Sequence, residues 1–529
     1  MTTTVEALLP TAPPTPYERW RGLLSNDPRL RGLTAWLAPL LVTLLAAVLR
    51  LVNLGHPHTL VFDETYYVKD AWSQWILGYA ATWPEDANAL FAAGQTDVFT
   101  TDPSFVVHPP LGKYLIGAGM ALFGADSSFG WRVAAALTGT ACVLVLYFLA
   151  KALVPSVVFA TIAAGLMAID GQAIVMSRVA LLDIFLAFFI LLAVWFMVLD
   201  RRTHLDRLAD AVRARTADGA ALWWGPVRWN RPWVLAAGAA AGAACGVKWS
   251  GVWVLAAVGI YLVVTDALER RRLGVMFWPM DALRQGAVSF VLLVPVAFVV
   301  YLSSWAGWLL TDGGYGRHTA DGQPATGLWS WVPLSLQSLW RYHETIYTSM
   351  AGMSTPHSYM SPAWAWPFLW RPTAMFTGSV PDGQDGCASA QGCLQIIYSI
   401  PNPLLWYAGV AAAVWIGYRF VMLRDWRYAV LLTAIAAAWL PWLLFPERTI
   451  FQFYTIALLP FLLLALTFAL RDVAGPAHAS AARRLAGQRV VLIVLAAAVV
   501  LSTFWYPLWS GMQVPYEFYR LHNWLPGWV

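Results

Sequence analysis

Apolar residues fall in long, nearly uninterrupted runs along most of the chain, separated by shorter polar segments. A helix needs about 20 apolar residues to cross the hydrocarbon core of a membrane, and runs of that kind predict eleven membrane-spanning helices. They are expected at 34–54, 131–153, 155–172, 179–199, 233–247, 250–266, 286–305, 401–418, 427–445, 450–470 and 489–507. The pattern therefore predicts an all-α polytopic membrane protein, with two long polar segments at 55–130 and 306–400.

Composition agrees with this pattern and excludes a soluble protein. Hydrophobic residues make up 59% of the chain and charged residues only 12%, against about 25% in an average globular protein. Trp occurs 31 times, and this residue gathers where a membrane meets water. The net charge of +5 comes without a basic run interleaved with aromatic residues in a polar segment, so nucleic acid is not an expected partner.

The distribution of basic residues predicts the orientation. With the N-terminus in the cytoplasm, 23 of the 34 Lys and Arg residues fall in cytoplasmic segments, as the positive-inside rule requires. An odd number of spans then places the C-terminus outside. We expect a cytoplasmic segment at 1–33, a transmembrane domain at 34–507 and an outer tail at 508–529, with both long polar segments on the outer face.

Two adjacent carboxylates, Asp63 and Glu64, follow the first predicted span directly. A pair of this kind is most often a solvated part of a loop. Here Phe62 and Tyr66 flank it, which indicates partial burial and a raised pKa for one of the carboxyl groups. Such a group is suited to act as a general base, so the pair is a candidate catalytic site.

The same outer segment contains the sequence His108-Pro-Pro-Leu-Gly-Lys113, which leads into an apolar stretch at 111–124. Two prolines predict an extended entry, and the stretch is too short to span the membrane. We therefore expect an interfacial helix here, with His108 and Lys113 at the level of the lipid headgroups. Ordinary snorkelling of Lys113 towards water is the alternative explanation.

Charged residues also cluster at the outer ends of the predicted spans. They are Arg132, Asp170, Arg178, Asp183, Lys248, Glu447 and Arg448. Taken alone, each of these residues is equally well explained as a member of a structural ion pair. Together, however, they place four cations around one outer rim, which is an arrangement that a lipid-linked phosphate needs.

The second outer segment is rich in aromatic residues. It contains Arg341-Tyr342-His343-Glu344 and, around His357, the sequence STPHSYMSPAWAWPFLWRP. Aromatic side chains suit the apolar faces of sugar rings, although anchoring at the membrane interface explains them equally well. Cys387 and Cys393 lie close together in the same segment. Because thiols outside the cell oxidise, we expect a structural disulfide between them.

At this point the residues resemble a known family. The FDE sequence after the first span, HPPLGK, SRVALLD at Ser177–Asp183, GVKWSG and HSYMSPAWAWPFLWRP are similar to motifs of the protein O-mannosyltransferases, in order and topology. The resemblance runs from Leu51 to the C-terminal tail and implies a GT-C glycosyltransferase fold. The second outer segment is too short for the β-trefoil domain of the eukaryotic members, so the chain looks like the actinobacterial branch.

The resemblance implies a reaction in which mannose moves from a polyprenyl phosphate to a Ser or Thr hydroxyl of a secreted protein, with inversion. By match to the family motif, Asp63 is implied as the base, and Glu64 as the residue that orients it or binds the acceptor backbone. Candidates for binding the donor phosphate are Arg132, Arg178, Lys248 and Arg448, with Arg178 and Lys248 favoured. Candidates for other substrate contacts are His108, Lys113, Asp183, Tyr342, His343 and His357.

The resemblance also implies partners and a location. The partners are the lipid-linked donor, Ser/Thr-rich secreted proteins and the secretion translocon, and the location is the plasma membrane. No cofactor or metal is assigned. A divalent ion at Asp63 and Glu64 stays an open alternative, for which a monophosphate donor gives less reason than a nucleotide sugar does. The alternatives are an arabinosyl- or aminoarabinosyltransferase of the same fold, a transporter, and a structural scaffold. A transporter predicts repeats and mid-membrane charges, and neither is visible.

Overall fold

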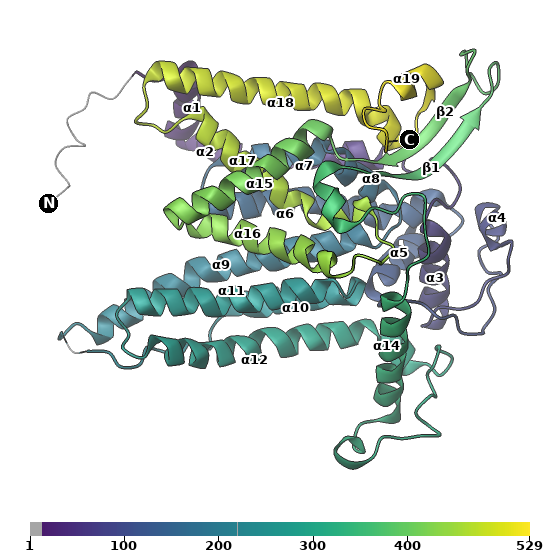
Figure 1. Cartoon of the computed structure of the whole chain (residues 1–529), viewed down its shortest axis with the longest axis horizontal. Helices are drawn as coiled ribbons and strands as arrows, with labels where there is room; N and C mark the ends of the chain where they lie inside the picture. Colours follow the sequence, from purple (N-terminus) through teal and green to yellow (C-terminus); the bar gives the residue numbers. More distant parts are fainter. Residues whose placement is uncertain (1–12, 220, 529) are drawn as a thin grey trace.

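Long helices packed side by side form most of the molecule, and they run roughly parallel in Figure 1. The structure is a computed structural model and describes residues 13–219 and 221–528. The long helices are α2 (Pro28–Leu51), α6 (Ser128–Leu153), α9 (Asp183–Arg215), α11 (Gly251–Arg272), α12 (Trp278–Ser304), α15 (Pro403–Leu423), α16 (Trp426–Trp439) and α18 (Ala481–Ser510). Shorter helices packed among them are α7 (Val157–Ile169), α8 (Gly171–Arg178), α10 (Pro232–Val247) and α17 (Leu459–Ala474).

The remaining elements are short and lie mostly outside the parallel bundle. The helices are α1 (Pro16–Asn26), α3 (Glu64–Leu77), α4 (Ala87–Ala92), α5 (Leu111–Phe123), α13 (Ala306–Leu310), α14 (Leu334–Ala351) and α19 (Tyr516–Arg520). The 3-10 turns are η1 (Gly327–Trp329), η2 (Ala363–Phe368), η3 (Leu440–Leu444) and η4 (Gln452–Ala457). The strands are β1 (Thr373–Val380), β2 (Cys393–Ser399) and β3 (Gln513–Pro515).

Within the described ranges, eight helices are long and apolar enough to cross a membrane, with α16 and η3 taken together. A ninth span results if the bent pair α7 and α8 is counted as one. Each of the eleven predicted segments is largely helical, but α10 and α17 have only 16 residues each. The multi-pass membrane architecture is therefore confirmed, whereas the predicted number of eleven spans is not.

The chain between α7 and α9 forms a further helix, α8, where the predicted spans at 155–172 and 179–199 left only a short connection. A bend of 58° separates α7 from α8, and Asp170 lies at this break. Its buried carboxylate accepts hydrogen bonds from the backbone N–H groups of Ala173 (3.1 Å) and Asn402 (3.0 Å). The side chain thus caps α8 and ties it to the start of α15, which is a structural role.

Small residues let α10 pack closely against α12. A Cβ atom at Gly238 would lie 2.5 Å from the Leu293 carbonyl oxygen, and one at Gly242 would lie 2.3 Å from that of Ala297. Side chains at these positions would therefore push the helices apart. Close packing of small residues is a common way for helices to associate in membranes.

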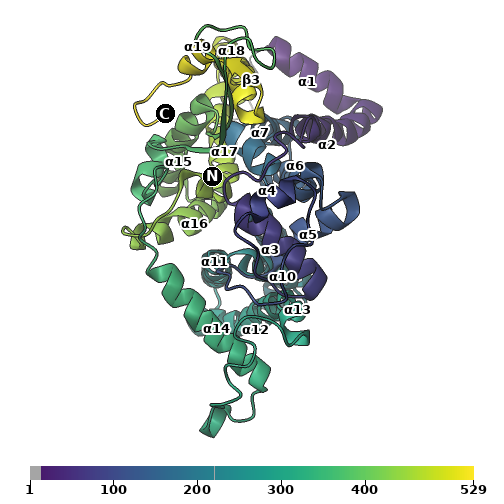
Figure 2. The ribbon, with the colours of Figure 1, turned by 90° about the vertical axis from the view of Figure 1, so that its right-hand side faces the viewer.

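The short elements α3, α4, α5 and α14 and the β-hairpin gather at one end of the bundle, at the right of Figure 1. Figure 2 views this end along the bundle. The predicted interfacial helix at 111–124 is α5, but it packs against α3, α6 and α10, with Gly112, Lys113 and Ile116 buried. It is thus part of the protein interior at this end of the bundle.

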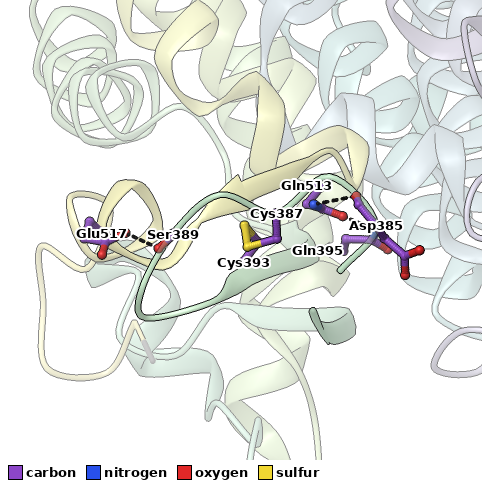
Figure 3. Close-up of a disulfide and its surroundings, with 7 residues drawn as sticks. All are labelled: Asp385, Cys387, Ser389, Cys393, Gln395, Gln513 and Glu517. Carbon is purple, nitrogen blue, oxygen red and sulfur yellow. Dashed lines mark hydrogen bonds between the residues drawn. A yellow bond between two sulfur atoms is a disulfide. The ribbon is translucent and has the colours of Figure 1, made fainter. Parts of the chain in front are cut away.

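A small antiparallel sheet, which the sequence did not predict, lies at the same end. The strand order is β1-β2-β3, so the chain after α18 returns to pair with the hairpin. Cys387 and Cys393, the predicted pair, are joined by a disulfide beside β2. Ser389 donates a hydrogen bond to Glu517, and Gln513 donates one to the Asp385 carbonyl, so the hairpin loop is fastened to the C-terminal segment (Figure 3).

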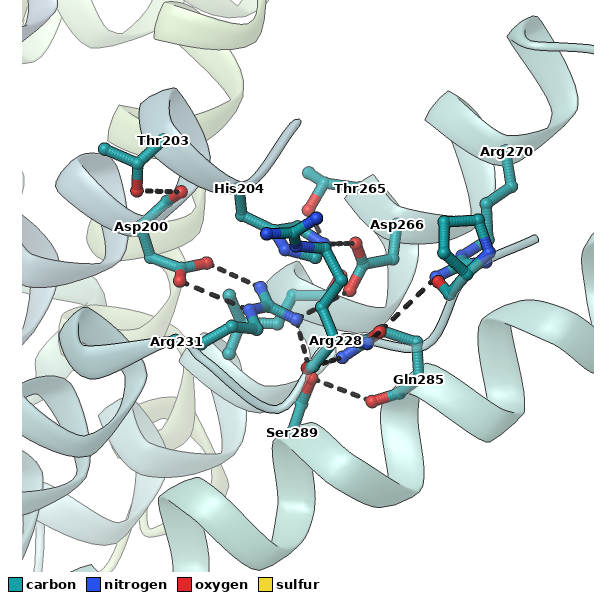
Figure 4. A network of polar contacts seen from close by, with 12 residues as sticks. Asp200, Thr203, His204, Arg228, Arg231, Thr265, Asp266, Arg270, Gln285 and Ser289 are labelled. Carbon is teal, nitrogen blue, oxygen red and sulfur yellow. Dashed lines mark hydrogen bonds and ion pairs between the residues drawn. The ribbon is translucent and has the colours of Figure 1, made fainter. Parts of the chain in front are cut away.

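A buried network of charges joins α9, α11 and α12 at the opposite end of the bundle (Figure 4). The Arg231 guanidinium pairs with Asp200 and Asp266, and it donates to Ser289 (2.8 Å). His204 contacts the second oxygen of Asp266 at 2.7 Å. All of these side chains are buried, so the network fixes how the helices sit relative to one another.

Candidate active site

The two adjacent carboxylates of the first outer segment point in different directions. Phe62, which precedes them, has a left-handed backbone with φ of 47°, a conformation that costs energy for a bulky residue. Its ring is held by Phe451, Phe453 and His357, at centroid distances of 5.7, 5.7 and 5.9 Å. The strained turn starts α3 and separates the environments of Asp63 and Glu64.

Glu64 is completely buried and fully hydrogen bonded. Its carboxylate forms a two-pronged ion pair with Arg132, with both N–O distances at 2.8 Å. It also accepts hydrogen bonds from the backbone N–H groups of Val61 (3.0 Å) and Ala180 (2.8 Å). Through these contacts Glu64 joins α3 to α6 and to the segment between α8 and α9, so it holds the turn that carries Asp63.

Asp63 has the opposite surroundings. Within the described residues, no group donates a hydrogen bond to its carboxylate, and the side chain is half-buried. Burial raises the pKa of the Asp63 carboxyl to about 6, with the Lys248 ammonium opposing the rise and the Asp183 carboxylate adding to it. A carboxylate that is accessible, unpaired and more basic than usual can accept a proton from a substrate.

Lys248 and Asp183, whose charges shift the pKa of Asp63 in opposite directions, form an ion pair with each other. The Lys248 ammonium lies 2.9 and 2.8 Å from the two Asp183 oxygens, and it also lies over the Tyr454 ring, 4.8 Å from the centroid. Asp183 begins α9, and Lys248 follows α10. Both are buried, so each stabilises the other's charge in an apolar region.

A pocket opens beside this pair. Its polar lining includes His108, Asp183, Lys248, Ser250, Arg448 and Tyr454, and its apolar lining includes Leu186, Ile190, Val254, Ala437, Ala438, Trp442 and Ala457. Asp183, Lys248 and Ser250 lie at or next to helix ends, His108 and Arg448 lie in connecting segments, and Tyr454 lies in η4. The apolar residues Leu186, Ile190, Val254, Ala437 and Ala438 lie along α9, α11 and α16. The pocket therefore has a charged mouth and an apolar wall that follows the spanning helices.

Arg448 differs from the other cations of the outer rim. It lies over the Trp442 ring, 5.5 Å from the centroid, and it forms no ion pair with any side chain of the described ranges. Its buried Nε has no hydrogen-bond partner among those residues. A partly buried guanidinium of this kind is available to bind an anion.

His108 lines the same pocket and is kept uncharged. Burial lowers the pKa of His108 well below its usual value, and the nearby Lys248, Lys113 and Arg448 cations lower it further. Its ring lies 6.0 Å from that of Tyr67, between centroids. A neutral imidazole offers one donor and one acceptor, which suits contact with a sugar hydroxyl.

Three of the basic residues predicted to contact the substrates have other partners in the structure: two phosphate candidates, Arg132 and Arg178, and Lys113. Arg132 is bound to Glu64, and Lys113 pairs with Asp70 at 3.1 Å. Arg178, which was favoured for the phosphate, donates to the backbone carbonyls at the end of α2. Its hydrogen bonds reach Leu49 (3.4 Å), Arg50 (3.1 Å), Val52 (2.8 Å) and Asn53 (3.0 Å). These carbonyls have no helical partner, so Arg178 closes the end of α2.

The remaining predicted residues lie at the end of the bundle that carries α3, α5 and α14 (Figure 1). Tyr342 shares hydrogen bonds with both backbone groups of Val106, and His343 is held by Tyr301 and the Leu339 carbonyl. Burial lowers the pKa of His343. His357 is exposed, but its ring contacts Phe62, the residue before Asp63. Of these three, His357 is therefore the one next to the carboxylate.

Sequence reasoning missed Tyr454 and Trp442, which form the aromatic side of the pocket. Tyr454 is placed by η4, whose backbone is fastened by Gln172 through hydrogen bonds to the Gln452 and Phe453 carbonyls. The sequence FPERTIFQFY did carry a signal, since aromatic residues surround Arg448. Among residues 13–219 and 221–528, no group of three or more His, Cys, Asp or Glu side chains is placed to hold a metal ion.

Two family models match the chain. Residues 99–310 match the family described as dolichyl-phosphate-mannose-protein mannosyltransferase, and residues 335–528 match the C-terminal four-transmembrane region of protein O-mannosyltransferase. Together they include the pocket residues His108, Asp183, Lys248, Arg448 and Tyr454, whereas Asp63 lies before the first matched range.

Curated relatives are similar over almost the whole length. The polyprenol-phosphate-mannose–protein mannosyltransferase of Mycobacterium tuberculosis is 34% identical over 517 residues, which cover 94% of this chain and 92% of the relative. The corresponding proteins of Mycolicibacterium smegmatis and Corynebacterium glutamicum are 32% identical, covering 93% of both chains, and 29% identical, covering 89% and 88%.

A solved structure has a similar fold. The Saccharomyces cerevisiae protein O-mannosyltransferase Pmt1-Pmt2 complex bound to the sugar donor matches with a TM-score of 0.69 and 16% identity. The match covers 93% of this chain and 92% of that chain. At this level of identity the likeness concerns the arrangement of the helices.

Proposed function

Because this chain belongs to the family of dolichyl-phosphate-mannose–protein mannosyltransferases, with the GT-C fold, we propose that it transfers mannose from a polyprenyl-phosphate donor to hydroxyl groups of proteins. The observation that carries the proposal is the Asp63 carboxylate, which has no hydrogen-bond donor among the described residues and is acted on by the charges of Asp183 and Lys248. These two residues line a pocket that has a charged mouth and an apolar wall. These features match an acceptor hydroxyl, a phosphate and a lipid chain.

In the proposed reaction, Asp63 takes the proton of a Ser or Thr hydroxyl as the oxygen attacks the anomeric carbon of mannose. The bond from this carbon to the phosphate oxygen breaks, and polyprenyl phosphate leaves with the negative charge. A single displacement of this kind inverts the anomeric centre. Only one proton acceptor is needed, which agrees with Glu64 being fully engaged by Arg132 and backbone N–H groups.

The departing phosphate is stabilised by cations rather than by an acid. We assign this role chiefly to Arg448, because its guanidinium lines the pocket without an ion-pair partner among the described residues. Lys248 adds positive potential, but it already neutralises Asp183. The lipid chain is expected to follow the apolar wall between α9, α11 and α16, where Ala437 and Ala438 leave space.

The acceptor is expected to approach from the outer end, across Tyr66 and His357, which are exposed beside Asp63. The orientation proposed from the basic residues agrees with this placement. The loop between α9 and α10 and helix α1 lie at the opposite end from α3 and α14 (Figure 1). Association with the secretion translocon and a location in the plasma membrane remain predictions.

The test is reconstitution of the purified protein in lipid nanodiscs with labelled polyprenyl-phosphate mannose and a Thr-rich peptide. The proposal predicts mannose on threonine, in the anomeric configuration opposite to that of the donor. A polyprenyl-phosphate arabinose donor and a glycan acceptor serve as parallel reactions. If only the arabinose donor or only the glycan is used, the chain is a different transferase of this fold.

The transfer rate should fall at acidic pH. Asp63 acts as a base only when ionised, and its pKa is raised to about 6, so activity is expected on the alkaline side and lost as pH drops through that value. The donor is a phosphodiester and keeps its charge across this range. Donor binding measured at the same pH values should therefore stay constant, and a rate independent of pH between 5 and 8 would exclude Asp63 as the base.

Replacing Arg448 by Ala should weaken donor binding. A hydrogen bond to a charged group contributes about 1.5–3 kcal/mol, which corresponds to roughly a ten- to hundred-fold rise in Kd. Binding of labelled polyprenyl-phosphate mannose to the nanodisc protein measures this directly. Arg520→Ala removes an exposed cation from the same end of the molecule and should leave Kd unchanged. Equal Kd values for the two variants would show that Arg448 does not bind the phosphate.

A further inference from the structure

An arm formed by residues 311–351 projects from the end of the bundle that carries the candidate active site. It consists of a loop and α14, and we refer to these residues as the outer arm. In Figure 1, α14 runs across the direction of the spanning helices, and the loop continues past α12. Figure 2, taken from the other direction, also shows the loop beyond the edge of the bundle. The outer arm therefore extends sideways, in the plane where a membrane surface would lie.

Two sets of contacts hold the outer arm in a defined conformation. At its base, Trp305, Trp308, Leu339, Tyr342 and Ile346 form a buried apolar cluster of their own. A second set of contacts fastens the loop to α14. In this set Gln337 accepts from Ala325 (2.6 Å) and donates to Val332 (2.7 Å), Ser338 accepts from Ala320 (3.0 Å), and Arg341 donates to the Thr319 and Gln323 carbonyls.

The tip of this well-held arm nevertheless exposes large apolar side chains. Leu328 is 89% exposed, Trp331 76% and Trp329 67%. On α14, Trp340 and Tyr347 are also exposed, and they lie about two helical turns apart on one face. No Asp, Glu, Lys or Arg occurs between residues 322 and 340. An uncharged, apolar tip that is rigidly presented to its surroundings is typical of a binding surface.

We propose that the tip of the outer arm inserts into the interfacial region of the lipid bilayer that surrounds the bundle. The arm follows α12 after only the short helix α13, so it starts close to the end of a helix that is long and apolar enough to span the membrane. It then passes beyond the protein's own helices and lies over lipid. Trp is favoured at this depth because its ring is apolar while its N–H can reach water, and the lack of charges removes the main cost of insertion.

This placement has a consequence for the candidate active site. The base of the arm contacts the segment that leads to His108, through the hydrogen bonds between Tyr342 and Val106. Through these contacts the arm fixes the pocket mouth at the depth of lipid headgroups, where the phosphate of a lipid-linked donor resides. The inference about the tip itself does not depend on which sugar is transferred.

The test uses spin labels on the full chain in lipid nanodiscs. Trp331→Cys carries a nitroxide, and its collisions with oxygen, which concentrates in lipid, are compared with collisions with a water-soluble nickel chelate. Cys142 and Cys245 are buried, and Cys387 and Cys393 are joined, so the new thiol is the accessible one. Phe290→Cys, exposed on α12, provides the lipid reference, and Glu85→Cys, exposed at the outer end, provides the water reference.

We expect the label at residue 331 to collide with oxygen more than with nickel, with a ratio nearer to that of residue 290 than to that of residue 85. Leu328→Cys, labelled in the same way, should agree and serves if Trp331→Cys does not fold. A ratio equal to that at residue 85 would show that the tip lies in water. Protection from both reagents would show that another protein, such as a second copy, covers the tip. Either result would overturn the proposal.

Discussion

Replacing Asp63 by Asn is expected to abolish most mannose transfer while leaving donor binding intact. A Ser or Thr hydroxyl is a poor nucleophile at neutral pH, and loss of a general base costs about 10²–10⁴-fold in rate. The amide keeps the shape of the side chain, and the Asp63 carboxylate makes no hydrogen bond that folding requires within the described residues. The measurement is the single-turnover rate of transfer, beside the Kd for labelled polyprenyl-phosphate mannose.

The matched control is Asp102→Asn, which changes an exposed carboxylate of the same outer segment and should leave both values unchanged. Transfer by Asp63→Asn at a rate close to that of the unaltered protein would rule out Asp63 as the base. Loss of donor binding together with transfer would point to a structural role for this residue instead.

Replacing Arg132 by Met should destabilise the protein strongly. The change leaves the Glu64 carboxylate buried without its ion-pair partner, and breaking a buried pair costs about 3–5 kcal/mol. It also removes the donors of the Pro57 and Thr59 carbonyls, each at 2.9 Å from the guanidinium. A large fall in Tm, measured by thermal unfolding in the same detergent or nanodisc, is the expected result.

Arg213→Ala is the control for this variant. Arg213 pairs with Asp210 on the protein surface, where an ion pair contributes about 0.2–1 kcal/mol, so its Tm should change little. Because the structure gives Arg132 no free donor towards the pocket, a folded Arg132→Met protein should also retain donor affinity. A stable variant with weakened donor binding would instead support the phosphate-binding role that the sequence suggested.

The sequence predicted the membrane architecture because a helix that crosses the hydrocarbon core must be apolar over most of its length, and such runs are visible in the sequence. It could not predict the break at Asp170 or the η4 turn, since both are determined by distant contacts, such as those of Asp170 with Asn402 and of Gln172 with η4. The three-stranded sheet was missed for the same reason. Its third strand, β3, lies more than a hundred residues beyond its partner β2.

For the site, the sequence located the charged rim but could not distinguish its members. Four basic residues occur at the outer ends of predicted spans: Arg132, Arg178, Lys248 and Arg448. In the sequence, an arginine that hydrogen bonds to the carbonyls of a helix end cannot be told from one that is free to bind an anion. The partners of each side chain in the structure favour one role over the other. Arg178 reaches the carbonyls that end α2, and Arg132 reaches Glu64, whereas Arg448 reaches neither carboxylate nor carbonyl among the described residues.

In the proposed reaction Asp63 and Arg448 act on opposite sides of the anomeric carbon. Asp63 accepts the proton of the attacking hydroxyl, and Arg448 binds the phosphate that leaves. The most direct measurement is a structure of Asp63→Asn in a nanodisc with polyprenyl-phosphate mannose bound. We predict the phosphate within hydrogen-bonding distance of Arg448, the lipid along Val254 and Ala438, and the anomeric carbon facing the side chain of residue 63. A phosphate bound at Arg178, or an anomeric carbon turned away from residue 63, would contradict this proposal.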